Sequence, residues 1–142
     1  MQPGIIVVGW PGVGKSHVAK HLKDWVNIDK PGMPTQEYIQ HIRDVLASGK
    51  NVLLPTWIKT RDALDAANLK YVMVLPARDL KADYHARYHK RGSDQVMIDA
   101  MCKNWDIQWD GCYAEKVHHR IIMRRSGDYL EDYIPEIVKR FS

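Results

Sequence analysis

The feature that most constrains the fold is a glycine-rich stretch that follows a short apolar run near the start of the chain. Residues 5–8 read IIVV, and residues 9–16 read GWPGVGKS. A continuous apolar run of this length is typical of a strand buried on both faces of a parallel sheet. Helical spacing follows, with Val18, Ala19 and Leu22 on one side. A strand, a glycine turn and a helix in this order predict the first unit of an α/β sheet.

The rest of the chain repeats this alternation, without internal repeats or linkers. Further strands are expected at 25–29, 51–54, 71–75 and 117–123, and helices at 14–24, 35–48, 59–67, 79–90, 93–105 and 129–141. Five buried strands joined by helices predict a three-layer α/β fold with right-handed crossovers. The 142 residues are therefore interpreted as one domain, 1–142, with a helical lid over about 79–112.

Composition and charge narrow the class of protein. The net charge is +4, which permits a polyanionic partner without requiring one. Cys102 and Cys112 match no zinc or redox spacing, and the seven histidines look scattered, so none is assigned a metal. No apolar run reaches the roughly 18–20 residues of a membrane span, and the first residues show no leader. These patterns predict no membrane partner and a cytoplasmic location (the host cytoplasm if the gene is carried by a phage).

Residues 9–16 match G-x-x-x-x-G-K-[ST], the Walker A pattern. Its glycines let backbone N–H groups point at phosphate oxygens, Lys15 is expected to reach the β- and γ-phosphates, and the Ser16 hydroxyl is expected to bind Mg²⁺. Trp10 could cover the phosphates as a lid, but a surface aromatic is the favoured interpretation. The pattern predicts ATP and Mg²⁺ as cofactors, bound by Gly9, Pro11, Gly12, Val13, Gly14, Lys15, Ser16 and His17.

Other segments separate the classes of nucleotide-binding protein. The chain has no N-K-x-D to read guanine, and the strand at 51–54 ends in Pro55-Thr56 without an acid. Motor-type ATPases carry such an acid, and the chain is also short for a motor or transporter. A small kinase remains. Asp29, at the end of the second strand, could orient an acceptor hydroxyl and accept its proton, a role worth about 10²–10⁴ in rate. The alternative for Asp29 is a cap of the turn at 30–32, and Asp24 is a weaker candidate for the base.

Cationic residues supply candidates for the migrating phosphoryl group. Arg87 and Arg91 are four apart, so they share a helix face and could clamp the phosphate, although a solvated basic face is the alternative. Arg61 is a substrate-side candidate together with Thr56 and Trp57. Two further arginines, Arg124 and Arg125, follow the fifth strand and are equally consistent with a nucleotide contact through Arg124 or with a surface turn.

Several segments together resemble a family of small phage P-loop kinases. These segments are 9–16, PTQEYIQHI at 34–42, YVMVLP at 71–76 with LKADY at 80–84, RYHKRGS at 87–93, and NWD at 104–106 with Trp109. The resemblance covers most of the chain to about residue 112. It implies an adenylate-kinase-like layout, with sheet order 2-3-1-4-5, and the lid role of Arg87 and Arg91.

This family includes 5-hydroxymethyluracil DNA kinases of phages that hypermodify thymidine. The resemblance implies ATP- and Mg²⁺-dependent phosphorylation of the 5-hydroxymethyl group of uracil within DNA, which prepares the base for later substitution. The chain departs from the family after the third strand, where Pro55-Thr56-Trp57 replaces a common Ser-Ser-His. A splayed base could stack on Trp57 or Trp105, but packing is the favoured interpretation of both tryptophans.

Two other functions stay open at this point. A nucleoside or nucleoside-monophosphate kinase would use the same loop, and a monophosphate acceptor would need an arginine cage such as Arg43 with Arg61. A regulatory ATP-binding module would need no transfer chemistry, and would leave the cations at 87–91 without a purpose.

Overall fold

The computed structural model describes residues 3–29 and 32–141 and contains a five-stranded, all-parallel sheet in the order β2-β3-β1-β4-β5. This confirms the α/β class and the predicted strand order. The central strands are almost wholly buried, as their continuous apolar sequence requires. The strands are β1 (Ile6–Gly9), β2 (Trp25–Asn27), β3 (Asn51–Pro55), β4 (Val72–Pro76) and β5 (His119–Met123).

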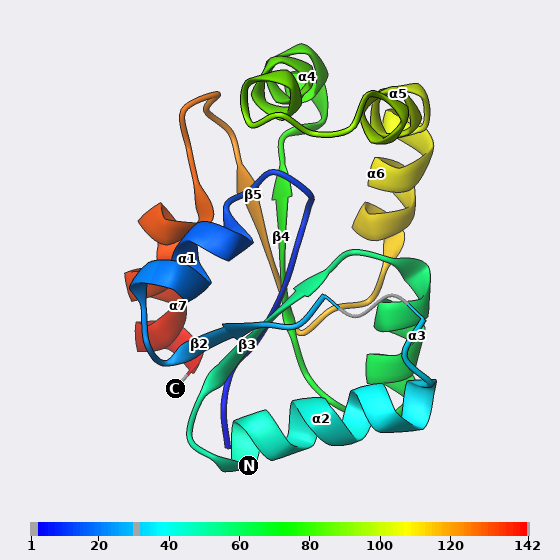
Figure 1. Ribbon diagram of the computed structural model, residues 1–142. Helices are drawn as coiled ribbons and strands as arrows, with labels where there is room; N and C mark the ends of the chain where they lie inside the picture. The colour runs from blue at the N-terminus through cyan, green and yellow to red at the C-terminus, as the bar shows by residue number, and fades with distance from the viewer. Residues whose placement is uncertain (1–2, 30–31, 142) are drawn as a thin grey trace.

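Helices cover both faces of the sheet (Figure 1). On one face lie α1 (Lys15–His21) and α7 (Ile134–Phe141), and on the other lie α2 (Thr35–Ala47), α3 (Ile58–Ala66) and α6 (Trp105–Ala114). The 3₁₀ turns are η1 (Arg78–Leu80) and η2 (Leu130–Tyr133). Two helices, α4 (Lys81–Lys90) and α5 (Gln95–Lys103), lie beyond the end of the sheet, at the top of Figure 1. None of the helices described here is long and apolar enough to cross a membrane.

The strand register brings the carboxyl ends of the strands to one edge. Gly9 pairs with Pro55, and Pro76 pairs with Met123. Ligands of open parallel sheets bind outside this edge. The glycine-rich turn after β1 and the segment after β2 both lie there, so the fold places the predicted site residues at the edge where chemistry is expected.

Several predicted boundaries were wrong, and three of them bear on the site or the core. The helix expected at 93–105 ends at Lys103, and a separate α6 runs on to Ala114 because it buries Trp105, Trp109 and Cys112 in the core. The last helix divides into η2 and α7, since Pro135 lacks an N–H and fits the first turn of a new helix. The predicted second strand, 25–29, ends at Asn27, which leaves Asp29 outside the ladder.

Candidate active site

The turn between β1 and α1, called the glycine loop (residues 9–16), is folded tightly at the carboxyl edge. The Trp10 N–H donates to the Val74 carbonyl at 3.0 Å, and the Val13 N–H donates back to Trp10 at 3.1 Å. Gly12 has a φ of 92°, a conformation that disfavours any side chain. A Cβ at Gly12 would also lie 2.7 Å from Tyr88 Cε1, so this position tolerates only glycine.

Lys15, the first residue of α1, turns its amine back into the glycine loop. Its Nζ donates to the Gly9 carbonyl at 2.7 Å and also contacts the Trp10 carbonyl at 3.4 Å. Burial lowers the pKa of Lys15 to about 8, the negative charge of Asp29 opposes this shift, and the positive charge of Arg91 adds to it. Three residues predicted to be catalytic therefore share one electrostatic neighbourhood.

Ser16 provides the hydroxyl that a magnesium ion would need. The side chain of Asn27, the last residue of β2, donates from Nδ2 to Ser16 Oγ at 3.3 Å. The Asn27 Oδ1 atom is buried and has no hydrogen-bond partner within the described residues. Mg²⁺ binds oxygen ligands such as hydroxyl groups and usually keeps several of its waters. The Ser16 hydroxyl therefore fits as a magnesium ligand, and Asn27 holds that hydroxyl through its amide N–H.

Arg87, on α4, contacts the backbone of the glycine loop. The guanidinium donates to the carbonyls of Gly12 at 2.9 Å, Ser126 at 2.6 Å and Asp128 at 3.1 Å. It also lies 4.3 Å from the ring centroid of Tyr84 and 3.9 Å from that of Tyr129. With its donors on three carbonyls, Arg87 joins α4 to the glycine loop and to the segment after β5, which makes it a positioning residue in this conformation.

Trp10 is not a surface aromatic, and that prediction was wrong. Its side chain is fully buried and packs edge-on against Trp105, with ring centroids 5.0 Å apart. The indole Nε1 donates to the Tyr88 hydroxyl at 3.2 Å, and that hydroxyl donates to the Pro11 carbonyl at 2.7 Å. A buried indole N–H needs such a partner. Trp10 thus fixes the glycine loop to α4.

The segments that follow β2 and β3 line a cavity of about 290 Å³, called here the aromatic cavity. Its lining includes Met33, Tyr38, Trp57, Ile58, Lys59 and Thr60. Burial raises the pKa of the Tyr38 hydroxyl to about 12; this hydroxyl is hydrogen-bonded to Thr60 and lies within range of the Asp29 charge. Trp57 is 43% exposed at the cavity. The structure therefore places Trp57 at the cavity, and it places Asp29 outside the cavity lining but within electrostatic range of Tyr38.

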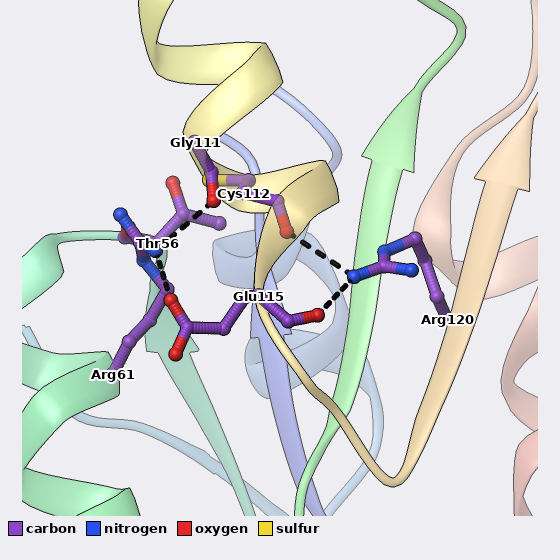
Figure 2. Close-up of polar contacts among 6 residues, drawn as sticks. All are labelled: Thr56, Arg61, Gly111, Cys112, Glu115 and Arg120. Atoms are coloured by element: carbon purple, nitrogen blue, oxygen red, sulfur yellow. Dashed lines mark hydrogen bonds and ion pairs between the residues drawn. The ribbon is translucent and has the colours of Figure 1, made fainter.

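Two predicted substrate-side residues point elsewhere. Arg61 is 7% exposed; it donates to the Thr56 carbonyl at 3.0 Å and pairs with Glu115 at 2.5 Å. Arg120 binds the same end of α6 from the other side, through the Cys112 and Glu115 carbonyls (Figure 2). The Thr56 side chain is buried and hydrogen-bonded to the Cys112 thiol. Arg61 and Thr56 hold α6 against α3 and β3, so assigning them to an acceptor was wrong for this conformation.

Because Arg61 is buried in an ion pair, Arg61→Ala is expected to act on stability. Removing one partner leaves the Glu115 carboxylate largely enclosed, and such losses cost roughly 3 kcal/mol or more. Urea denaturation should show this fall, while the KM for an acceptor stays near the wild-type value. Arg43→Ala is the matched control, since Arg43 is exposed and makes one hydrogen bond, to Ala67. A raised acceptor KM with unchanged stability would return Arg61 to the substrate.

The remaining predicted site residues are exposed and lie outside the glycine loop and the aromatic cavity. His17, one residue beyond Ser16, is exposed, pairs with Glu131 at 2.5 Å and packs against His21. Arg124 is exposed immediately after β5. Arg91 is exposed, bonds Ser93 through Nε at 2.6 Å, and lies over the Tyr88 ring. Of these three residues, Arg91 is the one whose charge reaches Lys15.

Sequence reasoning missed the aromatic contacts that surround the glycine loop. Tyr84 and Tyr88, on α4, pack against Gly12, and Tyr129 packs against Gly14. The helical spacing of Tyr84, Arg87 and Tyr88 puts all three on one side of α4, and this signal was available. Asn27, Tyr38 and Thr60 carried no comparable signal, because isolated polar residues in apolar segments have many explanations.

Comparison with known proteins adds the fold and nothing more specific. No family model and no curated protein matches the chain. The SH3-kinase fragment of tight junction protein 3, in its apo-form, is similar with a TM-score of 0.59 and 10% identity, over 98% of this chain and 57% of that fragment. An uncharacterized protein from Eubacterium ventriosum is similar with a TM-score of 0.51 and 14% identity, over 97% of each chain. The chain thus spans little more than half of the first structure.

Proposed function

We propose that this protein is an ATP-dependent P-loop kinase whose acceptor is an alcohol, the 5-hydroxymethyl group of 5-hydroxymethyluracil in DNA. The observation that carries the proposal is the position of Asp29. Its charge reaches both Lys15, in the glycine loop, and Tyr38, in the aromatic cavity. One carboxylate is therefore within electrostatic range of both a candidate phosphate site and a candidate acceptor site, as a general base for transfer must be.

The donor half of the proposal rests on the glycine loop. Lys15 would bind the β- and γ-phosphates, and Ser16, whose hydroxyl accepts a hydrogen bond from Asn27, would hold the magnesium ion. A bound Mg²⁺ would neutralise charge on the phosphates during transfer. Arg91 lies close enough to affect Lys15 and is the candidate cation for the migrating phosphoryl group. Arg87 keeps the Gly12 carbonyl in place.

In the proposed reaction, the acceptor hydroxyl oxygen attacks the γ-phosphorus and the bond from that phosphorus to the bridging oxygen of ADP breaks. The hydroxyl proton passes to the Asp29 carboxylate. Trp57 and Tyr38 would contact the planar base of the acceptor, since aromatic side chains stack on bases in a sequence-tolerant way. The products are ADP and a base carrying a phosphomonoester.

The aromatic cavity has too few cations to bind the phosphate of a nucleoside-monophosphate acceptor. Lys59 is the one cation among the described residues that line it. The two arginines that could form a phosphate cage are used elsewhere, Arg61 on Glu115 and Arg43 on Ala67. A free nucleoside remains the second candidate, because a cavity of about 290 Å³ is near the lower end of ligand pockets and suits one small molecule.

A transfer assay tests the proposal. The protein is supplied with γ-labelled ATP and Mg²⁺ and is offered DNA containing 5-hydroxymethyluracil, unmodified DNA, and free nucleosides and monophosphates side by side. The DNA is then digested to nucleosides, which separates phosphate on the base from phosphate on the ends. Label on the modified base alone supports the DNA-base kinase. Label on a free nucleoside favours the second candidate, and no transfer to any acceptor contradicts both.

Asp29→Asn is expected to lower the transfer rate by about 10²–10⁴ with nearly unchanged ATP binding, because the amide cannot accept the hydroxyl proton. Single-turnover rates and nucleotide titrations measured near neutral pH check both parts. Asp24→Asn is the matched control, since Asp24 is also exposed but precedes β2, at the opposite edge of the sheet. Wild-type turnover in Asp29→Asn would show that the base is another group.

A further inference from the structure

Two histidines lie one turn apart on the exposed side of α4. His85 and His89 are both exposed, and their Nε2 atoms are 3.3 Å apart. The two ring centroids are 4.5 Å apart, with an angle of 71° between the ring planes. Side chains four residues apart meet on a helix surface, so the backbone of α4 holds the pair together. The Nε2 atoms of the two imidazoles thus contact each other on the exposed side of the helix.

The separation of the two nitrogens matches the edge of a metal coordination sphere. Zinc binds histidine nitrogen at about 2.0–2.1 Å with tetrahedral angles, so two such ligands are about 3.3–3.4 Å apart. The observed 3.3 Å therefore matches this spacing, and zinc binding needs the two rings to turn so that both lone pairs face the ion. Imidazole suits zinc, copper and nickel, whereas magnesium and calcium prefer oxygen ligands. The pair consequently selects a class of ion different from the magnesium expected beside the glycine loop.

We propose that His85 and His89 form a zinc site in which their Nε2 atoms are two ligands and water completes the coordination. The two nitrogens are hydrogen-bonded to each other, so one neutral ring carries its proton on Nε2. Zinc binding moves that proton to Nδ1 of the same ring, which frees both Nε2 lone pairs. No residue of the proposed active site takes part in this binding.

A second histidine pair in the same spacing provides an internal comparison. His17 and His21 lie on α1, with ring centroids 4.3 Å apart and an interplanar angle of 48°. The His17 Nε2 atom, however, is paired with the Glu131 carboxylate at 2.5 Å. One nitrogen of this pair is therefore already bound. The two pairs share the sequence spacing H-x-x-x-H but differ in the partner of Nε2, which is the other histidine on α4 and the Glu131 carboxylate on α1.

A metal on α4 would act on the helix that supports the glycine loop. The turn between His85 and His89 contains Arg87 and Tyr88, which bond the Gly12 and Pro11 carbonyls. An ion that bridges this turn binds the folded helix and stabilises it by mass action. Zinc would thereby hold α4 in the conformation that contacts the glycine loop.

Zinc titration of the untagged, chelator-treated protein tests this site. Calorimetry with zinc chloride should show one ion per chain, and thermal denaturation should show a higher Tm with zinc but no comparable rise with magnesium chloride. His85→Ala and His89→Ala should each weaken zinc binding by about 10²-fold, because the second ligand of a linked pair binds intramolecularly. His21→Ala should bind zinc like the wild type.

The same histidine variants can also give results that contradict the zinc site. His85 and His89 are exposed, so the Tm without metal should barely change on their replacement, which separates lost binding from lost folding. Unchanged zinc affinity in His89→Ala, or a loss of affinity in His21→Ala, would place the ion elsewhere. Absence of any binding by the wild type would show that the pair is a hydrogen-bonded pair only. None of these outcomes depends on the kinase proposal, since no nucleotide is present.

Discussion

Replacing Trp10 with alanine is expected to lower the free energy of unfolding by roughly 3–5 kcal/mol, the usual cost of deleting a large buried aromatic side chain. Trp10 is fully buried, packs against Trp105, and donates its indole N–H to the Tyr88 hydroxyl. The substitution opens a cavity and removes one partner of the Tyr88 hydroxyl, which still bonds the Pro11 carbonyl. Equilibrium denaturation in urea, followed by circular dichroism, measures the change.

Trp57→Ala is the matched control for this prediction. The same residue type is removed, but Trp57 is 43% exposed, so a loss of about 1 kcal/mol or less is expected. The two tryptophans should also separate in function, because Trp10 supports the glycine loop whereas Trp57 lines the aromatic cavity. A stability loss in Trp10→Ala no larger than that in Trp57→Ala would contradict the structural role of Trp10.

The sheet could be predicted from the sequence because its signals are local. Residues 5–8, 51–54 and 71–75 are short apolar runs between helical or turn segments, and strands buried on both faces leave this trace. The glycine loop was equally visible, since its backbone conformation demands glycine at fixed positions. The strand order followed from the resemblance to small kinases. The boundary near Asn104 was missed because the burial of Trp105 and Trp109 fixes α6, and burial is decided by distant segments.

The site was harder to predict for the same reason. The partner of Arg61, Glu115, lies 54 positions along the chain, and the partner of Trp10, Tyr88, lies 78 positions along it. The sequence shows that an arginine follows β3 but cannot show whether its charge faces a ligand or a carboxylate. Asp29 had a stronger signal, since it stands just after β2 at the carboxyl edge, and its charge does reach Lys15.

Lys15→Ala is expected to reduce phosphoryl transfer by roughly 10³-fold or more, because a cation aimed at the phosphates stabilises charge in the transition state. The amine is already held in the glycine loop by the Gly9 carbonyl, so its loss removes a positioned group. Single-turnover transfer from γ-labelled ATP measures the effect. Lys20→Ala is the control, since Lys20 is an exposed lysine further along the same helix.

The pKa of Lys15 makes this prediction sharper. Burial lowers that pKa to about 8 in the free protein, whereas bound phosphates would favour the protonated amine and raise it. Above about pH 8 the free protein holds a neutral Lys15, so nucleotide binding must take up a proton. The affinity of the wild type for ATP should therefore fall as the pH rises, by up to about tenfold per pH unit. In Lys15→Ala the affinity should be weaker and nearly flat over the same range. A variant that keeps the wild-type pH dependence would show that another group titrates, and that Lys15 is not the residue that meets the phosphates.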